Sequence, residues 1–323
     1  MRFSLAVCSY SALAFALGGC NGHGLNNSFT PQVLSQAAQP DAQVRLFTAN
    51  RGGVSVLAFD AATSGNVAPV TKIAGPKTKF SMPGPLALDH SGNIYTADDN
   101  GTKVEVFGRN ADGNVAPKRV VGGSKSDLGP TEGILVDPTG NLWVSNIFNN
   151  EITEYAPEAH GNVAPINIIA GSNTQLNNPK GLAMNAAGQL YVANSSSAIL
   201  IFAKSASGNA SPWASIAGSK TGLITPFAIT FDSAGRLLIA DEDVGILVFD
   251  KGAKGNVAPS AIITGFDNPT GVVADAHDRI WAVDFGTNSM KEYAKNANGD
   301  ATALRTIKGK KTTLEDPLYL ALR

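Results

Sequence analysis

The chain of 323 residues has little cysteine, and the two cysteines that it has, Cys8 and Cys20, both lie near its N-terminus. The rest of the chain therefore has no disulfide framework, no cysteine-based zinc site and no cysteine nucleophile. It also has no excess of one charge, because 25 Lys and Arg stand against 26 Asp and Glu, a net charge of -1. Such a chain has no uniform field to attract nucleic acid or an acidic membrane surface, and we expect neither as a partner.

Aromatic residues are scarce, at 7%, but 43% of the chain is hydrophobic and only 16% is charged. This composition is too apolar for a disordered chain and is large enough to bury a core. The most apolar stretch, residues 3–17, is too short to span a membrane comfortably.

The first residues resemble an export signal. Arg2 is the only charge in residues 1–19, an apolar stretch follows it, and small residues precede Cys20. The sequence Leu17-Gly18-Gly19-Cys20 resembles a bacterial lipobox, which implies cleavage before Cys20 and acylation of its thiol. The alternative is a plain signal peptide, but this leaves an unexplained reactive thiol at the junction.

Residues 20–43 are polar and lack a sustained period, so we expect lipidated Cys20 and a flexible tether here. Asn21, rather than Asp, follows the cysteine, and this resembles sorting to the outer membrane or cell surface. The predicted organisation is a lipoprotein signal peptide at 1–19, the lipidated tether at 20–43 and a folded domain at 44–323. The lipid on Cys20 would be the domain's one membrane contact.

One motif recurs six times in the folded domain, at intervals of 44 to 48 residues. It reads SGNVAP from Ser64, DGNVAP from Asp112, HGNVAP from His160, SGNASP from Ser207, KGNVAP from Lys254 and a diverged NGDATA from Asn298. Each unit has four short apolar runs; in the second unit these are 86–89, 93–98, 103–107 and 117–122. Four strands in such a period predict an all-β protein, a six-bladed β-propeller of four-stranded blades.

The two ends of the domain predict how the ring closes. The first unit begins with its second strand, at 44–49, and the chain ends with residues 317–322, which align with the first strand of the other units. We therefore expect the C-terminal strand to complete the N-terminal blade, because this removes open sheet edges.

Residues that recur in every unit are predicted to be structural, since an active site is needed only once. One such set ends the second strand of each unit and consists of Asn50, Asp98, Asn146, Asn194, Asp241 and Asp284, which we interpret as turn caps. The Gly-Asn of the repeated motif is predicted to turn between the third and fourth strands. Its proline is predicted to enter the outermost strand and to discourage edge pairing.

The strand pairs of these units carry a family resemblance. PKGLAMNAAGQLYVAN at 179–194, TEGILVDPTGNLWVSN at 131–146 and PTGVVADAHDRIWAVD at 269–284 resemble NHL repeats, a six-bladed class with YVTN-type and gluconolactonase-like relatives. The resemblance covers residues 44–323 and implies the propeller fold. It does not imply one function, because the class contains scaffolds, binding proteins and enzymes.

Positions that differ between the units are the candidates for function. In a propeller, the loops from fourth to first strand and from second to third strand share the face at the mouth of the central channel. The candidate contacts there are Glu132, Lys180, Phe227 and Thr270 at the start of the innermost strands, Tyr319 in the last strand, and Phe148 and Phe285 beyond the second strands. The alternative is that these residues are solvated loop tips.

The sequence favours a binding protein over an enzyme. We expect a lipid-anchored module of the cell envelope that binds a protein, peptide or glycan at the channel mouth, with no cofactor and no catalytic residue. A blade-edge scaffold is a weaker alternative.

The competing function is a divalent-metal-dependent hydrolase or lyase acting at the same mouth. The gluconolactonase-like resemblance implies a cation such as calcium or zinc, with Glu132 as a ligand, although Lys180 and Thr270 occupy positions that would carry other ligands. NHL-class lyases depend on histidines, but His90, His160 and His277 fall in turns away from the mouth, and His23 lies in the tether.

Overall fold

The computed structural model describes residues 44–99 and 101–323. The predicted signal peptide, the lipidated Cys20 and the tether lie outside the described residues. Within the described ranges, no helix is both long enough and apolar enough to cross a membrane.

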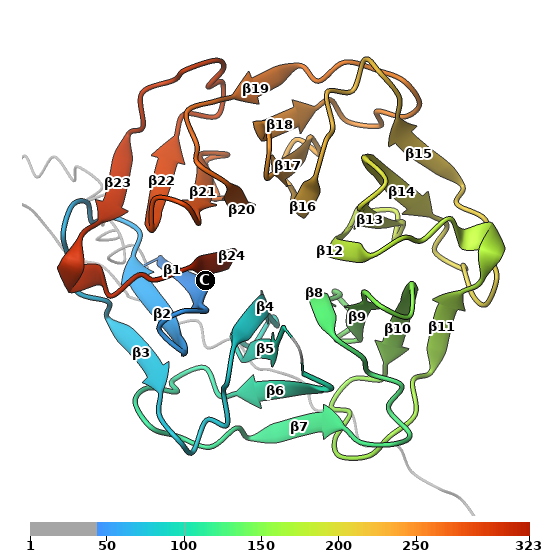
Figure 1. The fold of residues 1–323 in the computed structure, drawn as a ribbon, viewed down its shortest axis with the longest axis horizontal. Coiled ribbons are helices and arrows are strands. Elements are labelled where there is room, and N and C mark those ends of the chain that lie inside the picture. The colour runs from blue at the N-terminus through green and yellow to red at the C-terminus, as the bar shows by residue number, and fades with distance from the viewer. Residues whose placement is uncertain (1–43, 100) are drawn as a thin grey trace, which may run out of the picture. The chain divides into compact units, whose positions relative to one another are not determined.

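The described residues form six four-stranded antiparallel sheets arranged as blades around a central axis (Figure 1). The first blade contains β24 (Pro317–Leu322), β1 (Arg45–Asn50), β2 (Ser55–Asp60) and β3 (Thr71–Ala74). The second contains β4 (Pro83–Leu88), β5 (Ile94–Asp98), β6 (Lys103–Phe107) and β7 (Arg119–Gly122). The third contains β8 (Thr131–Val136), β9 (Leu142–Asn146), β10 (Glu151–Tyr155) and β11 (Asn167–Ala170).

The remaining three blades repeat this order from the innermost to the outermost strand. The fourth contains β12 (Pro179–Met184), β13 (Leu190–Asn194), β14 (Ala198–Phe202) and β15 (Ala214–Ala217). The fifth contains β16 (Pro226–Phe231), β17 (Leu237–Asp241), β18 (Gly245–Phe249) and β19 (Ala261–Ile263). The sixth contains β20 (Pro269–Ala274), β21 (Ile280–Asp284), β22 (Ser289–Tyr293) and β23 (Arg305–Lys308). Two short 3-10 helices, η1 (Ser172–Thr174) and η2 (Lys310–Thr312), lie in connections that lead to innermost strands.

The predicted closure of the ring is confirmed. Strand β24 pairs with β1 in antiparallel register, with Leu46 opposite Leu322 and Asn50 opposite Pro317. Beyond the strand ends, the N–H of Arg45 donates to the carbonyl of Arg323 over 2.7 Å. The last residues of the chain therefore supply the innermost strand of the first blade.

The blades stack through the faces of their middle strands, which are buried on both sides. Strands β13, β17 and β21 read LYVAN, LLIAD and IWAVD, and every residue in them is buried. A strand covered on both faces has an almost continuous apolar sequence rather than an alternating one. This is why the apolar runs of each unit predicted the strands so well.

The role predicted for the proline of the repeated motif is wrong. In the second blade, Pro117 lies two residues before β7 rather than within it. The Gly-Asn turn of the motif instead contacts the preceding blade: the N–H of Gly113 donates to the carbonyl of Lys72 over 2.9 Å, and Asn114 Oδ1 accepts from the N–H of Lys77 over 2.8 Å. Equivalent glycine bridges occur at all six blade junctions, so the motif joins neighbouring blades.

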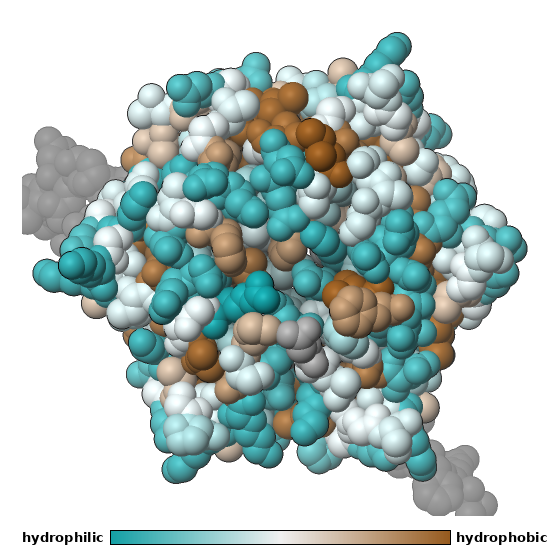
Figure 2. Space-filling model, viewed as in Figure 1, coloured by the Kyte–Doolittle hydropathy of each residue, from teal (hydrophilic) through white to brown (hydrophobic). Residues whose placement is uncertain are grey.

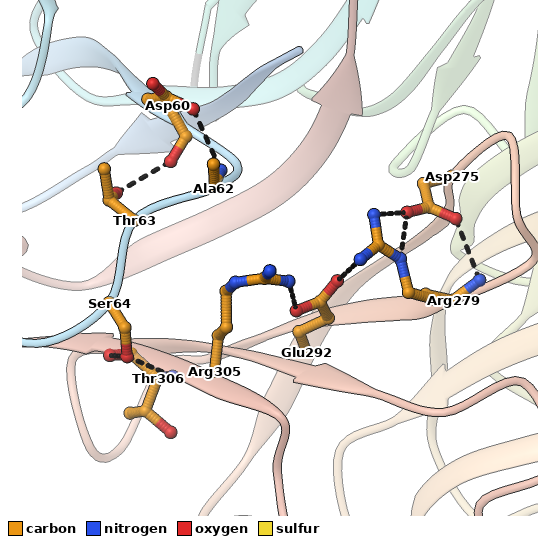
Figure 3. Close-up of polar contacts among 9 residues, drawn as sticks. All are labelled: Asp60, Ala62, Thr63, Ser64, Asp275, Arg279, Glu292, Arg305 and Thr306. Atoms are coloured by element: carbon orange, nitrogen blue, oxygen red, sulfur yellow. Dashed lines mark hydrogen bonds and ion pairs between the residues drawn. The ribbon is translucent and has the colours of Figure 1, made fainter. Parts of the chain in front are cut away.

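A buried acidic residue holds an ion-pair network together within the sixth blade (Figure 3). Glu292 is fully buried and accepts a hydrogen bond from Arg305. It also forms an ion pair with Arg279, whose Nη1 lies 3.1 Å from Glu292 Oε1, and Arg279 pairs with Asp275 over 2.6 Å. Beside this network, the Ser64 hydroxyl donates to the carbonyl of Thr306 over 3.1 Å. A buried carboxylate is tolerated here because two guanidinium groups compensate its charge.

We expect deletion of residues 317–323 to destabilise the ring strongly, because it removes an innermost strand and exposes the edge of β1. Urea unfolding of the shortened protein measures the loss. A fully stable, monomeric shortened protein would contradict closure by β24.

A matched pair of point variants covers the case in which the shortened protein does not fold. Leu320→Ala removes a side chain of β24 that is 7% exposed, whereas Leu304→Ala removes one that is 55% exposed. We expect losses of about 2–5 kcal/mol for the first and under about 0.5 kcal/mol for the second.

Candidate functional site

An irregularity in the innermost strands positions the variable residues at the mouth. In every blade the pairing between the first and second strands shifts register near the start of the innermost strand. In the third blade this shift lies between Thr131 and Gly133 and so contains Glu132. A bulge of this kind redirects a side chain without requiring a particular residue type.

Glycines that follow the variable residue bring neighbouring innermost strands close together. A Cβ atom on Gly133 would lie 2.2 Å from the carbonyl oxygen of Lys180, and one on Gly181 would lie 2.5 Å from that of Phe227. Only a residue without a side chain allows this approach. Because these strands lie so close together, Glu132, Lys180 and Phe227 follow one another around the channel mouth, one from each of three neighbouring blades.

These side chains enclose a cavity of about 190 Å³ at the mouth of the channel. Its lining residues come from all six blades and are Arg51, Asp99, Glu132, Lys180, Phe227, Glu242, Asn268, Thr270, Phe285 and Leu318. Figure 2 shows this face of the ring, where hydrophilic and hydrophobic side chains both lie around the centre.

Two ion pairs line the cavity. Arg51 Nε lies 2.9 Å from Asp99 Oδ2, and Lys180 Nζ lies 3.0 Å from Glu242 Oε2. The Lys180 ammonium also lies 4.6 Å from the centre of the Phe227 ring, a cation–π distance. Each pair is neutral in itself, so neither supplies net charge to the cavity.

Glu132 is the third carboxyl group of the cavity, and its side chain has no hydrogen bond or ion pair with the residues that the structure describes. Burial, together with the nearby carboxylate of Asp99, raises the pKa of Glu132 to about 7, although Lys180 opposes this shift. The group is therefore poised to lose or gain a proton near neutral pH.

Tyr319 closes the bottom of the mouth cavity. Its hydroxyl donates to the backbone carbonyl of Glu132, and its ring packs 5.1 Å from that of Phe227. Burial raises the pKa of Tyr319 well above its ordinary value. Below this residue the channel continues as an apolar cavity of about 240 Å³, lined by the middle of the innermost strands.

The structure brings together most of the residues predicted from the sequence. Glu132, Lys180, Phe227, Thr270 and Phe285 all line the mouth cavity, and Tyr319 borders the apolar cavity below it. The Thr270 hydroxyl is already engaged, because it donates to the carbonyl of Pro317 over 3.1 Å. Phe148 does not line the cavity, and its side chain is 68% exposed.

Five lining residues were not among the predicted contacts: Arg51, Asp99, Glu242, Asn268 and Leu318. Arg51, Asp99 and Glu242 occupy the variable positions beyond the second strands, so the signal that marked Phe285 also marks them. Asn268 directly precedes β20, as Asn178 precedes β12 and Asp316 precedes β24. The Oδ1 atom of Asn268 is buried and accepts no hydrogen bond from the described residues.

The recurrent Asx residues at the second-strand ends are structural, as predicted. Asn50 Oδ1 accepts from the N–H of Glu315, and Asp241 accepts from the N–H groups of Ile224 and Thr225. Asp98, Asn146, Asn194 and Asp284 make equivalent bonds to the loops that enter their own blades. Their oxygens are occupied in fixing the mouth loops.

The donor set of the cavity does not fit a divalent cation. Among the described residues there is no group of three or more His, Cys, Asp or Glu side chains that could hold a metal ion. Asp99 and Glu242 are paired with cations, which leaves Glu132 as a single free carboxyl group. Calcium requires roughly six to eight oxygen ligands, so Glu132 and the free amide oxygen of Asn268 are too few for the metal role that the gluconolactonase-like resemblance implied.

A larger cavity, of about 580 Å³, lies on the opposite face between the fourth and fifth blades. Tyr191, Phe231 and the 57% exposed Trp213 contribute to its lining. Its acidic residue, Asp232, is paired with Arg236 over 2.6 Å. The mouth is the stronger candidate site because it holds a carboxyl group without a partner.

Comparisons with known proteins identify the fold. No protein-family model matches the chain, and no curated protein matches its sequence. A chain of the nidogen/laminin complex is 16% identical, with 86% of this chain and 98% of that one covered and a TM-score of 0.60. A protein of unknown function from Bacteroides caccae is 12% identical, with 87% and 99% covered and a TM-score of 0.62.

A third similar structure is virginiamycin B lyase from Staphylococcus aureus. It is 14% identical, with 83% of each chain covered and a TM-score of 0.57. These likenesses show a six-bladed β-propeller and leave the function to be argued from the site.

The raised pKa of Glu132 predicts a pH-dependent stability. The folded protein holds this proton more tightly than the unfolded chain, where the pKa is 4.5, so stability falls as the pH rises from about 4.5 to about 7. Glu132→Gln removes the charge, and we expect it to raise the free energy of unfolding by about 1–3 kcal/mol near pH 8 and to change it little near pH 4.5. Urea unfolding at both pH values measures the difference.

Glu315→Gln is the matched control, because Glu315 is exposed on the same face outside the cavity. The Glu132→Gln protein should keep part of the pH dependence, since burial also raises the pKa of Glu105 to about 8. A Glu132→Gln protein less stable than wild type near pH 8 would show that the carboxylate stabilises the fold.

Proposed function

We propose that this protein is a recognition module that binds a protein, peptide or glycan at the mouth of its propeller channel. The observation that carries the proposal is the mouth cavity, where two ion pairs, an unpaired carboxyl group and two phenylalanines meet at residues that vary from blade to blade. Binding sites combine an apolar surface with a few fixed polar groups in this way.

The neighbours of the charged groups support recognition on a preformed surface. Asp99 is buried, and the Lys180–Glu242 pair is mostly shielded from solvent, so these groups lose little freedom when a ligand binds. The second strands and their Asx caps hold the loops from which Arg51, Asp99 and Glu242 project. Phe285 supplies an apolar wall that a ligand can cover.

Variants at the mouth test this function. We expect Phe285→Ala to weaken binding to the protein's ligands on a peptide and glycan array by about tenfold, because one apolar wall of the cavity is lost. Trp213→Ala, which removes an exposed aromatic side chain from the opposite rim, should leave binding unchanged. Equal loss in both variants, or in neither, would argue against recognition at the mouth.

Phe148→Ala separates two sizes of ligand in the same assay. A partner that extends over the rim will lose affinity with this variant, whereas a ligand confined to the cavity will not. Chemical turnover of an array ligand would instead favour the competing hydrolase or lyase function.

We further propose that the protein is an exported lipoprotein anchored through Cys20 at the outer membrane or cell surface. The lipobox-like sequence before Cys20 supports this placement. Several acyl chains on one residue hold a protein at a bilayer stably. The recognition surface would then act in the cell envelope, where peptides and glycans are available.

Labelling with a fatty acid in bacteria tests the anchor. We expect the wild-type chain to incorporate the label and to sediment with membranes, and Cys20→Ser to do neither, because the acylated thiol is lost. Cys8→Ser is the matched control and should behave as wild type. Labelling that persists in Cys20→Ser would exclude this residue as the lipid site.

A further inference from the structure

We propose that the mouth cavity binds a primary ammonium group and that Glu132 is its counter-ion. This inference rests on the recognition function proposed above and names the chemical class of the ligand. Lysine side chains and amino sugars both carry such a group.

The charge balance of the cavity is the first argument. Two cations, Arg51 and Lys180, face three carboxyl groups, Asp99, Glu132 and Glu242. The two ion pairs account for four of these groups. One negative charge is left when Glu132 is ionised, so a ligand with one positive charge makes the cavity neutral.

The walls of the cavity suit an ammonium group. Phe227 and Phe285 both line it, and Lys180 Nζ already lies 4.6 Å from the centre of the Phe227 ring. This internal contact shows that an ammonium group at the mouth can lie against an aromatic face. The cavity volume of about 190 Å³ admits a compact group rather than a whole peptide or sugar chain.

Asn268 supplies a second free acceptor in the same cavity as Glu132. It lines the same cavity, and its buried Oδ1 atom accepts no hydrogen bond from the described residues. A buried acceptor without a donor is unfavourable. An ammonium group carries three donors, and a small rotation of the amide could let Oδ1 accept one of them while Glu132 accepts another.

Binding of an ammonium group is coupled to the proton on Glu132. Burial and the neighbouring Asp99 and Glu242 carboxylates favour the protonated form, whereas Lys180 and Arg51 oppose it, and the pKa is raised to about 7. The buried Tyr319 hydroxyl is neutral in this range. The ligand must displace the proton to solvent, so its affinity should rise about tenfold between pH 6 and pH 8.

Calorimetric titration with defined probes tests the proposal. The probes are Nα-acetyl-lysine N-methylamide with its neutral isostere Nα-acetyl-norleucine N-methylamide, and methyl glucosaminide with methyl glucoside. We expect an amine to bind at least about tenfold more tightly than its neutral partner. The lysine probe, whose ammonium group stays protonated up to about pH 8, should also show the pH dependence given above. The amine that binds more tightly identifies the source of the ammonium group.

Variants connect the binding to the cavity. Glu132→Gln should weaken the amine at least about tenfold near pH 8, whereas Glu315→Gln, which removes an exposed carboxylate on the same face, should leave it unchanged. Equal affinity for amine and isostere, no effect of Glu132→Gln, or no amine binding would each overturn the proposal. The array result with Phe285→Ala would still decide the recognition function separately.

Discussion

The pairing of β24 with β1 is the constraint on which the candidate site depends. This pairing joins the two ends of the domain. It also positions two residues of β24 at the mouth cavity, where Leu318 lines the wall and Tyr319 closes the bottom. Tyr319 donates its hydroxyl hydrogen to the carbonyl of Glu132, in a blade that is not adjacent in the ring. Assembly of the mouth therefore requires ring closure.

Repetition and variation have separate structural roles in this ring. The glycine bridges between blades and the Asx caps at the mouth have the same role in every blade. The residue types at these positions therefore vary little from one blade to the next. The bulge in each innermost strand also recurs, but it places no demand on the side chain that it presents. That freedom lets the blades present Gly84, Glu132, Lys180 and Phe227 at equivalent positions.

Much of the fold could be predicted from the sequence because its determinants are local and repeated. The four apolar runs of each unit became its four strands, and residues 317–322 became β24 as expected. In the second blade, the start of the innermost strand was predicted too late, at residue 86 instead of Pro83, because the bulge interrupts the apolar pattern. The inter-blade contact of Gly113 was missed because its partner strand lies in the preceding unit.

The sequence predicted where the site lies, but it did not predict which side chains form ion pairs there. The residue type at the start of the innermost strand differs between the repeated units, and this made Glu132 and Lys180 candidates for the site. Both line the cavity. The partner of Lys180 is Glu242, from another blade, and no local pattern indicates which of the acidic residues on this face it meets. Such pairings follow from ring geometry, which brings together residues that are far apart in sequence.

The unpaired state of Glu132 is the feature least explained by the needs of the fold. Burial raises its pKa to about 7, so the ionised group costs stability near neutral pH. Gly84 at the equivalent position shows that a blade closes without any side chain there, and Thr270 shows that a neutral hydroxyl can bond to the adjacent strand. The residue type at this position varies between blades, and the ionised carboxyl group of Glu132 lowers stability. Ligand binding therefore explains Glu132 better than a role in stabilising the fold does.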